Sequence, residues 1–225
     1  MNKLNEYDLK RCITILPKNL KNIMIKDFWK NKIFIGGGYI RSIITNEKIN
    51  DIDLFVDSKE SAKTLCFELA NKKDDVIETE NAFTIKGRLD IQIIHRWLFE
   101  KKEDVANSFD FTCCCAVISF NDNWDSYCDE NYYQDLAAKR LVYRFPPRNE
   151  DAGGSMLRIL KYYQKGFRIP LDSLGGVIAR LLKDYDVNKT PLSDEKAVAK
   201  IITGLLREVD PNVDPTHQSH LPSNN

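Results

Sequence analysis

The chain has 225 residues, 43% of them hydrophobic, which is enough for one large domain or two small ones with a buried core. Its 33 lysines and arginines equal its 33 aspartates and glutamates, and this excludes nucleic-acid binding through overall positive charge. The N-terminal sequence lacks the features of a signal peptide, and no apolar run is long enough to span a bilayer. We therefore expect a cytoplasmic protein that makes no membrane contact.

The six cysteines form no CxxC pair, which argues against both a zinc site and a disulfide framework. The run Cys113-Cys114-Cys115 predicts a β-strand that fills both of its faces with small hydrophobic side chains. We therefore expect the cysteines to be reduced and structural.

Hydrophobic periodicity predicts a mixture of helices and strands in the first part of the chain. The expected helices are 5–16, 18–30, 39–45 and 58–71, and the expected strands are 33–35, 51–56, 75–78, 82–86 and 88–94. The helix over 58–71 should be capped by Asp57 or Ser58. Strands flanked by helices in this way indicate an α+β fold, with a mixed sheet, for a head domain over residues 1–147.

Beyond Pro146-Pro147 the pattern becomes helical. Helices are predicted over 155–165, 171–185 and 193–209, which gives a short, neck-like helical part over 148–209. Residues 210–225 have almost no apolar content and are predicted to be a disordered tail.

Three consecutive glycines follow the strand over 33–35 and precede a helix. Glycines at such a junction let backbone N–H groups converge on an anion, and Arg41 lies one turn into the helix as a cationic partner. Gly37, Gly38 and Arg41 are therefore a candidate triphosphate cradle. Tight packing of the turn is the alternative explanation for the glycines.

The sequence DIDLFV places two carboxylates on one side of a strand, because alternate residues of a strand face the same way. Asp51 and Asp53 repel each other, and a divalent cation with oxygen ligands, Mg²⁺ or Mn²⁺, would hold them together. Asp90 adds a third carboxylate on the strand over 88–94. Three such groups beside a glycine cradle are what metal-dependent phosphoryl transfer requires, whereas two solvated aspartates at a strand start are the alternative.

Two common nucleotide-binding motifs are absent from the chain. It has no GxxxxGK[ST] segment, which excludes a P-loop, and no GxGxxG segment, which excludes the dinucleotide-binding fingerprint.

The segment GGYIR, followed ten residues after its arginine by DIDLFV, resembles the signature of the DNA polymerase β-like nucleotidyltransferase superfamily. The pattern is closest to the head domain of the bacterial poly(A) polymerase and CCA-adding enzyme family. Three later segments are similar to that family in the same order: DFTCCCAV at 110–117, QDLAAKRLVYRF at 134–145 and EDAGGSMLRILKYYQKGFRI at 150–169.

The resemblance implies a nucleotidyltransferase that uses Mg²⁺ or Mn²⁺ and an NTP, either ATP or CTP. It assigns nucleotide binding to Gly37, Gly38, Arg41, Asp110 and Arg158. It assigns metal binding and catalysis to Asp51 and Asp53, and the wider superfamily adds Asp90. The implied acceptor is an RNA 3′ end, and pyrophosphate is the other product.

This chain departs from the family at positions that select the nucleotide. Ser42 replaces an aspartate, Ser108 and Phe109 replace two arginines, and Gly154 or Ser155 stands where the family has a base-reading arginine. An arginine fork would recognise a base by its hydrogen-bond pattern. We therefore expect a minimal, divergent member that does not add C, C and A in order. Its small size and its many Asn, Lys and Ile residues are typical of phage or mobile-element proteins.

Basic and aromatic side chains interleave around the junction of the two parts. The cluster comprises Lys139, Arg140, Tyr143, Arg144, Arg148, Arg158, Lys161, Tyr162, Tyr163, Lys165 and Arg168. Such a cluster favours contact with RNA or a nucleotide, since the rings would stack on bases, although a solvated helix face is the alternative.

Two other functions remain open from the sequence. The chain would transfer a nucleotide to a protein or a small molecule, or it would be a non-catalytic nucleotide-binding, RNA-binding or structural protein that keeps the fold. The intact DID and Asp90 favour catalysis, whereas the lost arginines favour the non-catalytic alternative. The sequence does not identify the nucleotide, the acceptor or the oligomeric state.

Overall fold

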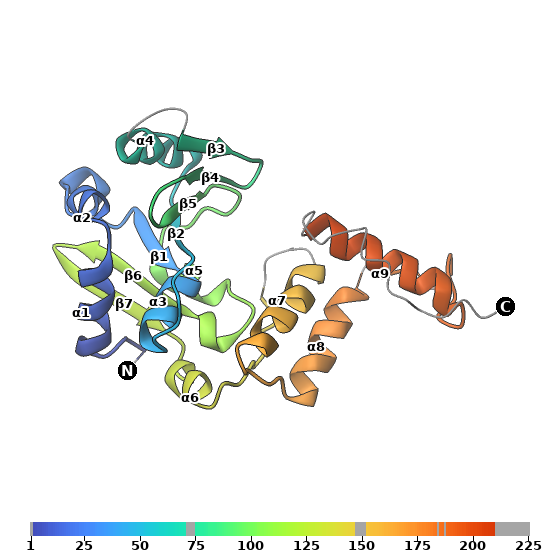
Figure 1. Ribbon diagram of the computed structural model, residues 1–225. Helices are drawn as coiled ribbons and strands as arrows, with labels where there is room; N and C mark the ends of the chain where they lie inside the picture. Colours follow the sequence, from blue (N-terminus) through green and yellow to red (C-terminus); the bar gives the residue numbers. More distant parts are fainter. Residues whose placement is uncertain (1, 71–74, 147–151, 184, 187, 210–225) are drawn as a thin grey trace. The chain divides into compact units, whose positions relative to one another are not determined.

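A computed structural model describes residues 2–70, 75–146, 152–183, 185–186 and 188–209 (Figure 1). Contacts between backbone positions divide the chain into two units, Met1–Pro147 and Arg148–Asn225. The predicted tail over 210–225 lies outside the described residues.

The first unit is built on a seven-stranded sheet with the strand order β3-β4-β5-β2-β1-β6-β7. Its strands are β1 (Ile33–Gly36), β2 (Asp51–Val56), β3 (Val76–Glu78), β4 (Ala82–Ile85), β5 (Asp90–Ile94), β6 (Ala116–Asn121) and β7 (Asn123–Cys128). Only the β2 and β5 pair is parallel among these neighbours; the others are antiparallel. The predicted α+β class with a mixed sheet is confirmed.

The first unit also contains short helices. They are α1 (Glu6–Ile15), α2 (Lys18–Met24), the 3₁₀ helix η1 (Asp27–Trp29), α3 (Gly38–Ile44), α4 (Lys59–Leu69), α5 (Lys102–Asn107), the 3₁₀ helix η3 (Thr112–Cys114) and α6 (Tyr132–Ala137). Ser58 caps α4, as expected, because its hydroxyl accepts a hydrogen bond from the Ser61 N–H at 3.0 Å.

Two sequence predictions were wrong in this unit. The helix expected over 18–30 ends at Met24, and the chain re-forms as η1, where the buried Trp29 indole donates a hydrogen bond to Glu68 of α4. The three consecutive cysteines do not form a strand, because Cys113 and Cys114 belong to η3 and β6 begins only at Ala116. Backbone bonds from Thr112 to Val142 and from Arg144 to Asp110 hold this segment against a later part of the chain. All six cysteines are buried and free, as expected.

Side chains of β2 point alternately to the two sides of the sheet. Ile52 and Leu54 are fully buried on the side where α4 contacts the strand. Asp51, Asp53 and Phe55 lie on the other side, which we call the carboxylate face. The strand therefore separates an apolar layer beneath the helices from a face that carries charge.

One end of the carboxylate face is covered by α5. Phe34, Phe55 and Val117 of the sheet form an apolar cluster with Val105 and Ala106 of this helix. The cluster anchors the strand segment that directly follows the two aspartates. The two aspartates lie on the same face at the start of β2, next to this cluster.

The second unit consists of α7 (Ala152–Gln164), α8 (Leu171–Leu181) and α9 (Glu195–Val209). The helix α7 contacts both α8 and α9. Ile159, Tyr162, Phe167 and Val177 are buried in this unit. Among the described residues, we find no helix whose length and apolar character would suffice to cross a membrane.

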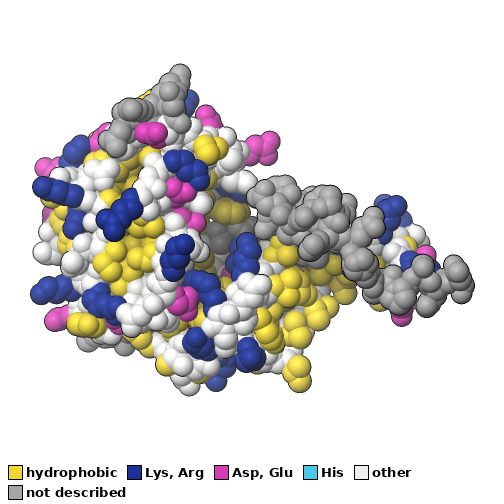
Figure 2. Space-filling view, in the orientation of Figure 1, with side chains coloured by type: hydrophobic (Ala, Val, Ile, Leu, Met, Phe, Trp, Pro, Cys, Tyr) yellow, Lys and Arg dark blue, Asp and Glu magenta, His cyan; other side chains and the backbone are white. Residues whose placement is uncertain are grey.

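The visible face of the first unit carries both charges. Figure 2 shows its lysine and arginine side chains scattered among aspartate and glutamate rather than collected in one patch. This agrees with the equal numbers of basic and acidic residues in the sequence.

We predict that Phe55→Ala lowers the free energy of unfolding by about 3 kcal/mol, because the ring is 4% exposed and its loss leaves a cavity under α5. Phe67→Ala is the matched control, since that ring is 76% exposed, and it should change stability by less than about 0.5 kcal/mol. Urea denaturation of both variants measures the difference. Equal effects of the two substitutions would contradict the packing described here.

Candidate active site

Strand pairing brings the glycine turn next to the aspartate pair. In the antiparallel register of β1 and β2, Gly36 is the partner of Asp53. Gly37 and Gly38 follow directly, and α3 begins at Gly38. The structure thus joins two motifs that the sequence separates by fifteen residues, Gly36 and Asp51.

Gly37 approaches the Asp53 carboxylate closely. Its φ of 71° lies in the left-handed region, and a Cβ at this position would be 2.6 Å from Asp53 Oδ2. Any side chain here would therefore both strain the backbone and collide with the carboxylate. The glycine preserves the space in front of one oxygen of Asp53.

Arg41 lies beside the same turn and is 5% exposed. A Cβ at Gly38 would be 3.5 Å from Arg41 Nη2, and Arg41 Nε lies 3.8 Å from Glu47 Oε2. The guanidinium group therefore lies between the first turn of α3 and the loop after the helix. The predicted grouping of Gly37, Gly38 and Arg41 exists in the structure.

The surroundings of the Asp53 carboxyl disfavour its ionised form. Burial raises its pKa to about 7, and the negative charge of Asp51 and the thiol of Cys114 add to the rise. Near neutral pH the pair consequently carries less than its full charge of two. A cation bound at these oxygens would favour the fully ionised form.

Gln92 is a site residue that the sequence interpretation missed. It lies on β5 opposite Asp53, and its Nε2 donates a hydrogen bond of 3.1 Å to Asp51 Oδ2. The alternation of Asp90 and Gln92 in LDIQII was the available signal, because both residues face the same way as the aspartate pair. Gln92 fixes the orientation of one carboxylate through a neutral partner.

Asp90 is the backbone partner of Asp51, but its side chain is engaged elsewhere. Its carboxylate accepts hydrogen bonds from Lys86 Nζ at 2.7 Å and from the Gly87 N–H at 3.2 Å. The Lys86 hydrogen bond is also the main reason why the pKa of Asp90 is lowered. No group of three His, Cys, Asp or Glu side chains suited to a metal occurs among the described residues. The expected three-carboxylate cluster is therefore not assembled here, because the ion pair with Lys86 holds the third member.

The donor set fits a magnesium ion. Mg²⁺ commonly binds through one or two carboxylates and completes its shell with water and substrate phosphates. Asp51 and Asp53 supply two carboxylates on the same side of β2, next to the glycine turn. These two residues would hold the ion, which would neutralise phosphate charge beside the glycine turn.

The remaining predicted residues occupy different places. Asp110 is buried, and its neighbour Phe109 packs so near the turn that a Cβ at Gly36 would be 3.0 Å from the Phe109 ring. The segment that includes Asp110 therefore adjoins the glycine turn. Arg158 is half-buried on α7 in the second unit, and its role in nucleotide binding stays a prediction.

Comparison with known proteins adds family and fold information. A family model described as Gabija anti-defense 2 family protein matches residues 11–139, more than half of the chain. A protein of Bacillus phage SPbetaL7 named Gabija anti-defense 2 is 28% identical over 148 residues. The match covers 65% of this chain and 36% of that protein, so the chain spans about a third of the length of its relative.

Solved structures of CCA-adding enzymes share the fold. The Thermotoga maritima CCA-adding enzyme complexed with tRNA has a TM-score of 0.56 and 17% identity, covering 93% of this chain and 57% of that one. A CCA-adding enzyme with CTP has a TM-score of 0.57 and 15% identity, covering 92% of this chain and 50% of that one. The chain therefore has a nucleotidyltransferase fold, whereas the matching family model is not that of the CCA-adding enzymes.

We predict that Gly37→Ala destabilises the protein by at least about 1 kcal/mol, because it combines an unfavourable φ with a contact on Asp53. Gly175→Ala in α8 is the matched control, since its Cβ would meet nothing within 4 Å. That change should be neutral or stabilising by up to about 1 kcal/mol. Thermal unfolding of both variants tests the prediction, and a neutral Gly37→Ala would refute the close approach.

A second prediction concerns pH in the presence of EDTA. Because the folded protein raises the pKa of Asp53 from 3.8 to about 7, it binds this proton more tightly than the unfolded chain. The contribution of this proton to the free energy of unfolding is fully present below about pH 4 and is lost as the pH rises through 7. Asp53→Asn should therefore gain about 4 kcal/mol relative to the wild type between pH 4 and pH 8, since each pKa unit corresponds to about 1.4 kcal/mol.

Denaturant titrations at several pH values measure this gain. Asp27→Asn is the control, because Lys30 lowers the pKa of this exposed carboxyl and its effect should have the opposite sign. A pH-independent difference between Asp53→Asn and the wild type would contradict a raised pKa.

Proposed function

The chain belongs to the Gabija anti-defense 2 family, and on that premise we propose that it is a metal-dependent nucleotidyltransferase. It would move a nucleotide from an NTP to an acceptor hydroxyl and release pyrophosphate. The proposal depends mainly on one observation: Asp51 and Asp53 lie beside the glycine turn, which approaches so closely that a Cβ at Gly37 would be 2.6 Å from Asp53 Oδ2. The nucleotidyltransferase fold of the chain supports the same activity.

In this proposal, each residue at the turn has a distinct task. Backbone N–H groups at Gly37 and Gly38 bind the triphosphate, and the Arg41 guanidinium adds a fixed positive charge beside them. Asp51 and Asp53 hold Mg²⁺ or Mn²⁺, which would neutralise charge on the phosphates. Gln92 keeps one oxygen of Asp51 in place through its hydrogen bond.

The chemistry breaks a phosphoanhydride bond of the NTP and forms a phosphoester bond to the acceptor. The acceptor oxygen bonds to the α-phosphorus, the bond from that phosphorus to the bridging oxygen breaks, and pyrophosphate leaves with that oxygen. The acceptor proton would pass to water. With a cation bound, Asp53 would be ionised and act as a ligand, because the positive charge lowers the raised pKa that this carboxyl has without the ion. Asp90 would take part only after separating from Lys86.

An RNA 3′ end is the acceptor that we propose first. One structural neighbour is complexed with tRNA and another with CTP, which supports an RNA acceptor and CTP or ATP as donor. Phe109 occupies the position next to the turn where the resembled enzymes have an arginine. Strict selection of the base is therefore not part of this proposal.

The family match favours a second candidate function. The relative in Bacillus phage SPbetaL7 is named as an anti-defense protein, so the acceptor here would be a component of a host defence system. Transfer of a nucleotide to a protein hydroxyl uses the same donor chemistry as transfer to RNA. A non-catalytic protein that binds such a component is the remaining alternative.

We predict that the wild-type protein with Mg²⁺ or Mn²⁺ and labelled NTP transfers label to RNA, to itself or to a defence protein supplied in the reaction. Asp51→Asn and Asp53→Asn should each reduce the rate at least about 100-fold, because the cation loses a carboxylate ligand. Asp27→Asn is the control and should retain the wild-type rate, because Asp27 is an exposed residue of η1 that pairs with Lys30 and is not part of the proposed site. Denaturing gels separate the labelled products.

The position of the label distinguishes the acceptors, and a melting experiment distinguishes catalysis from binding. Mg²⁺ or Mn²⁺ should raise the melting temperature of the wild type but not of Asp51→Asn/Asp53→Asn. Absence of both label transfer and metal stabilisation would refute the proposed enzyme and leave a binding role for the fold.

A further inference from the structure

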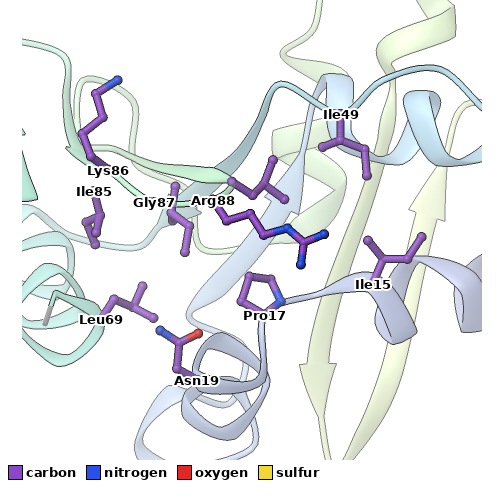
Figure 3. A pocket seen from close by; sticks show the side chains of 11 residues that line it. Ile15, Pro17, Asn19, Ile49, Leu69, Ile85, Lys86, Gly87 and Arg88 are labelled. Atoms are coloured by element: carbon purple, nitrogen blue, oxygen red, sulfur yellow. The ribbon is translucent and has the colours of Figure 1, made fainter.

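A cavity of about 630 Å³ lies in the first unit (Figure 3), and neither Asp51 nor Asp53 lines it. Its walls come from the end of α1 and the start of α2, the segment before β2, the last residue of α4, and the hairpin of β4 and β5 with its turn. Ile15, Leu69, Ile85 and Ile91 give it an apolar interior, and Asn19 and Arg88 add polar groups. Small-molecule sites typically have volumes of about 300 to 1,000 Å³ and a similar mixture of lining residues.

The cavity lies on the opposite side of the sheet from the carboxylate face. Ile85 pairs with Ile91 in the register of β4 and β5, and Ile91 pairs with Ile52 in the register of β5 and β2. Paired residues point to the same side of a sheet, whereas neighbours such as Asp51 and Ile52 point to opposite sides. The cavity is therefore a separate site and not an extension of the proposed nucleotide site.

Arg88 supplies the charge in this cavity. Figure 3 shows its side chain extending toward Pro17, whereas Lys86 points away from the lining side chains. The Lys86 ammonium group is occupied by Asp90. In the described part of the chain, Arg88 has no hydrogen bond, ion pair or ring contact. Its guanidinium group thus stands beside an apolar space with its donors available.

Asn19 offers a second donor to the same cavity. The residue is exposed, and its Oδ1 accepts a hydrogen bond from the Leu20 N–H at 2.9 Å. Its Nδ2 makes no hydrogen bond with any of the residues that the structure describes. The residues that line the cavity include no aspartate or glutamate, so none of them would compete with an anionic ligand for Arg88.

We propose that this cavity binds a small amphipathic anion. The apolar body of the ligand would pack against Ile15, Ile85 and Ile91, and its carboxylate or phosphate group would bind the Arg88 guanidinium. A planar guanidinium matches both of these anions through two parallel hydrogen bonds. Asn19 Nδ2 would donate to the same head group. The bound ligand would accept hydrogen bonds from Arg88 and Asn19 and would remove the apolar lining side chains from water.

The first test measures binding of the full-length protein to 8-anilinonaphthalene-1-sulfonate, an aromatic body with one anionic group, by fluorescence titration. Arg88→Gln should weaken binding about tenfold, which corresponds to about 1.4 kcal/mol for a lost charged hydrogen bond. Arg88→Lys should weaken it less. The neutral probe N-phenyl-1-naphthylamine should bind the wild type and Arg88→Gln within about twofold of each other.

Arg96→Gln is the matched control, because it removes the same charge beyond the other end of β5, where the Arg96 guanidinium lies over the Trp97 ring. It should leave binding of the anionic probe unchanged. Competition with decanoate and with decyl phosphate then distinguishes a carboxylate head group from a phosphate. Equal weakening by Arg88→Gln and Arg96→Gln would overturn the proposal, because the probe would then respond only to net charge.

A second measurement locates the probe. In protein labelled at the isoleucine δ1 methyl groups, the anionic probe should shift the signals of Ile15, Ile49, Ile85 and Ile91, which line the cavity. Ile118, fully buried on β6, should not shift. Shifts confined to other isoleucines would place the probe elsewhere and refute the cavity as its site, whatever the result with Arg88→Gln.

Discussion

The close approach of Gly37 to Asp53 is the constraint on which the proposed site depends. The antiparallel pairing of β1 and β2 sets Gly36 beside Asp53, and the next residue turns with a positive φ directly in front of the carboxylate. Only glycine meets both requirements there. Because the same turn begins α3, Arg41 is brought to the side of Gly38. One steric contact thereby fixes the positions of an anion-binding turn, a cationic side chain and a carboxylate pair.

Apolar and acidic side chains alternate along the first part of β2, so the two sides of the sheet differ in character. Its apolar residues Ile52 and Leu54 are buried beneath the helical layer, on the side of the sheet where Ile85 and Ile91 line the cavity. Its aspartates face the other way, between the apolar cluster under α5 and the polar end of the face. A substrate at the aspartates and an amphipathic anion in the cavity would therefore bind to opposite sides of the same strands. The sheet therefore separates the two sites, and the same strands hold the residues of both in place.

The sequence predicted part of the fold and most members of the candidate site. The apolar run over 33–35 located β1, the run over 51–56 with its alternating aspartates located β2, and the capping residue Ser58 located the start of α4. Strands β6 and β7 were not predicted, and the strand expected through the cysteines was wrong, since hydrogen bonds from distant residues shape that segment. Gln92 was overlooked because its alternation with Asp90 was the only signal, and the strand pairing that brings it to Asp51 follows only from the tertiary structure. Asp90 shows the converse, because a nearby lysine directs its carboxylate away from the pair.

The sequence by itself determined that two carboxylates share one side of a strand and that three glycines precede a helix, because both facts follow from local backbone geometry. It also carried the resemblance to nucleotidyltransferases, whose fold the chain has. The tertiary structure alone decided which groups meet: Gly37 with Asp53, Gln92 with Asp51 and Lys86 with Asp90. It also created the cavity beside Arg88. The physical reason is that strand register and helix packing bring together residues that are distant in the sequence, and these contacts set the orientation and the charge of each side chain.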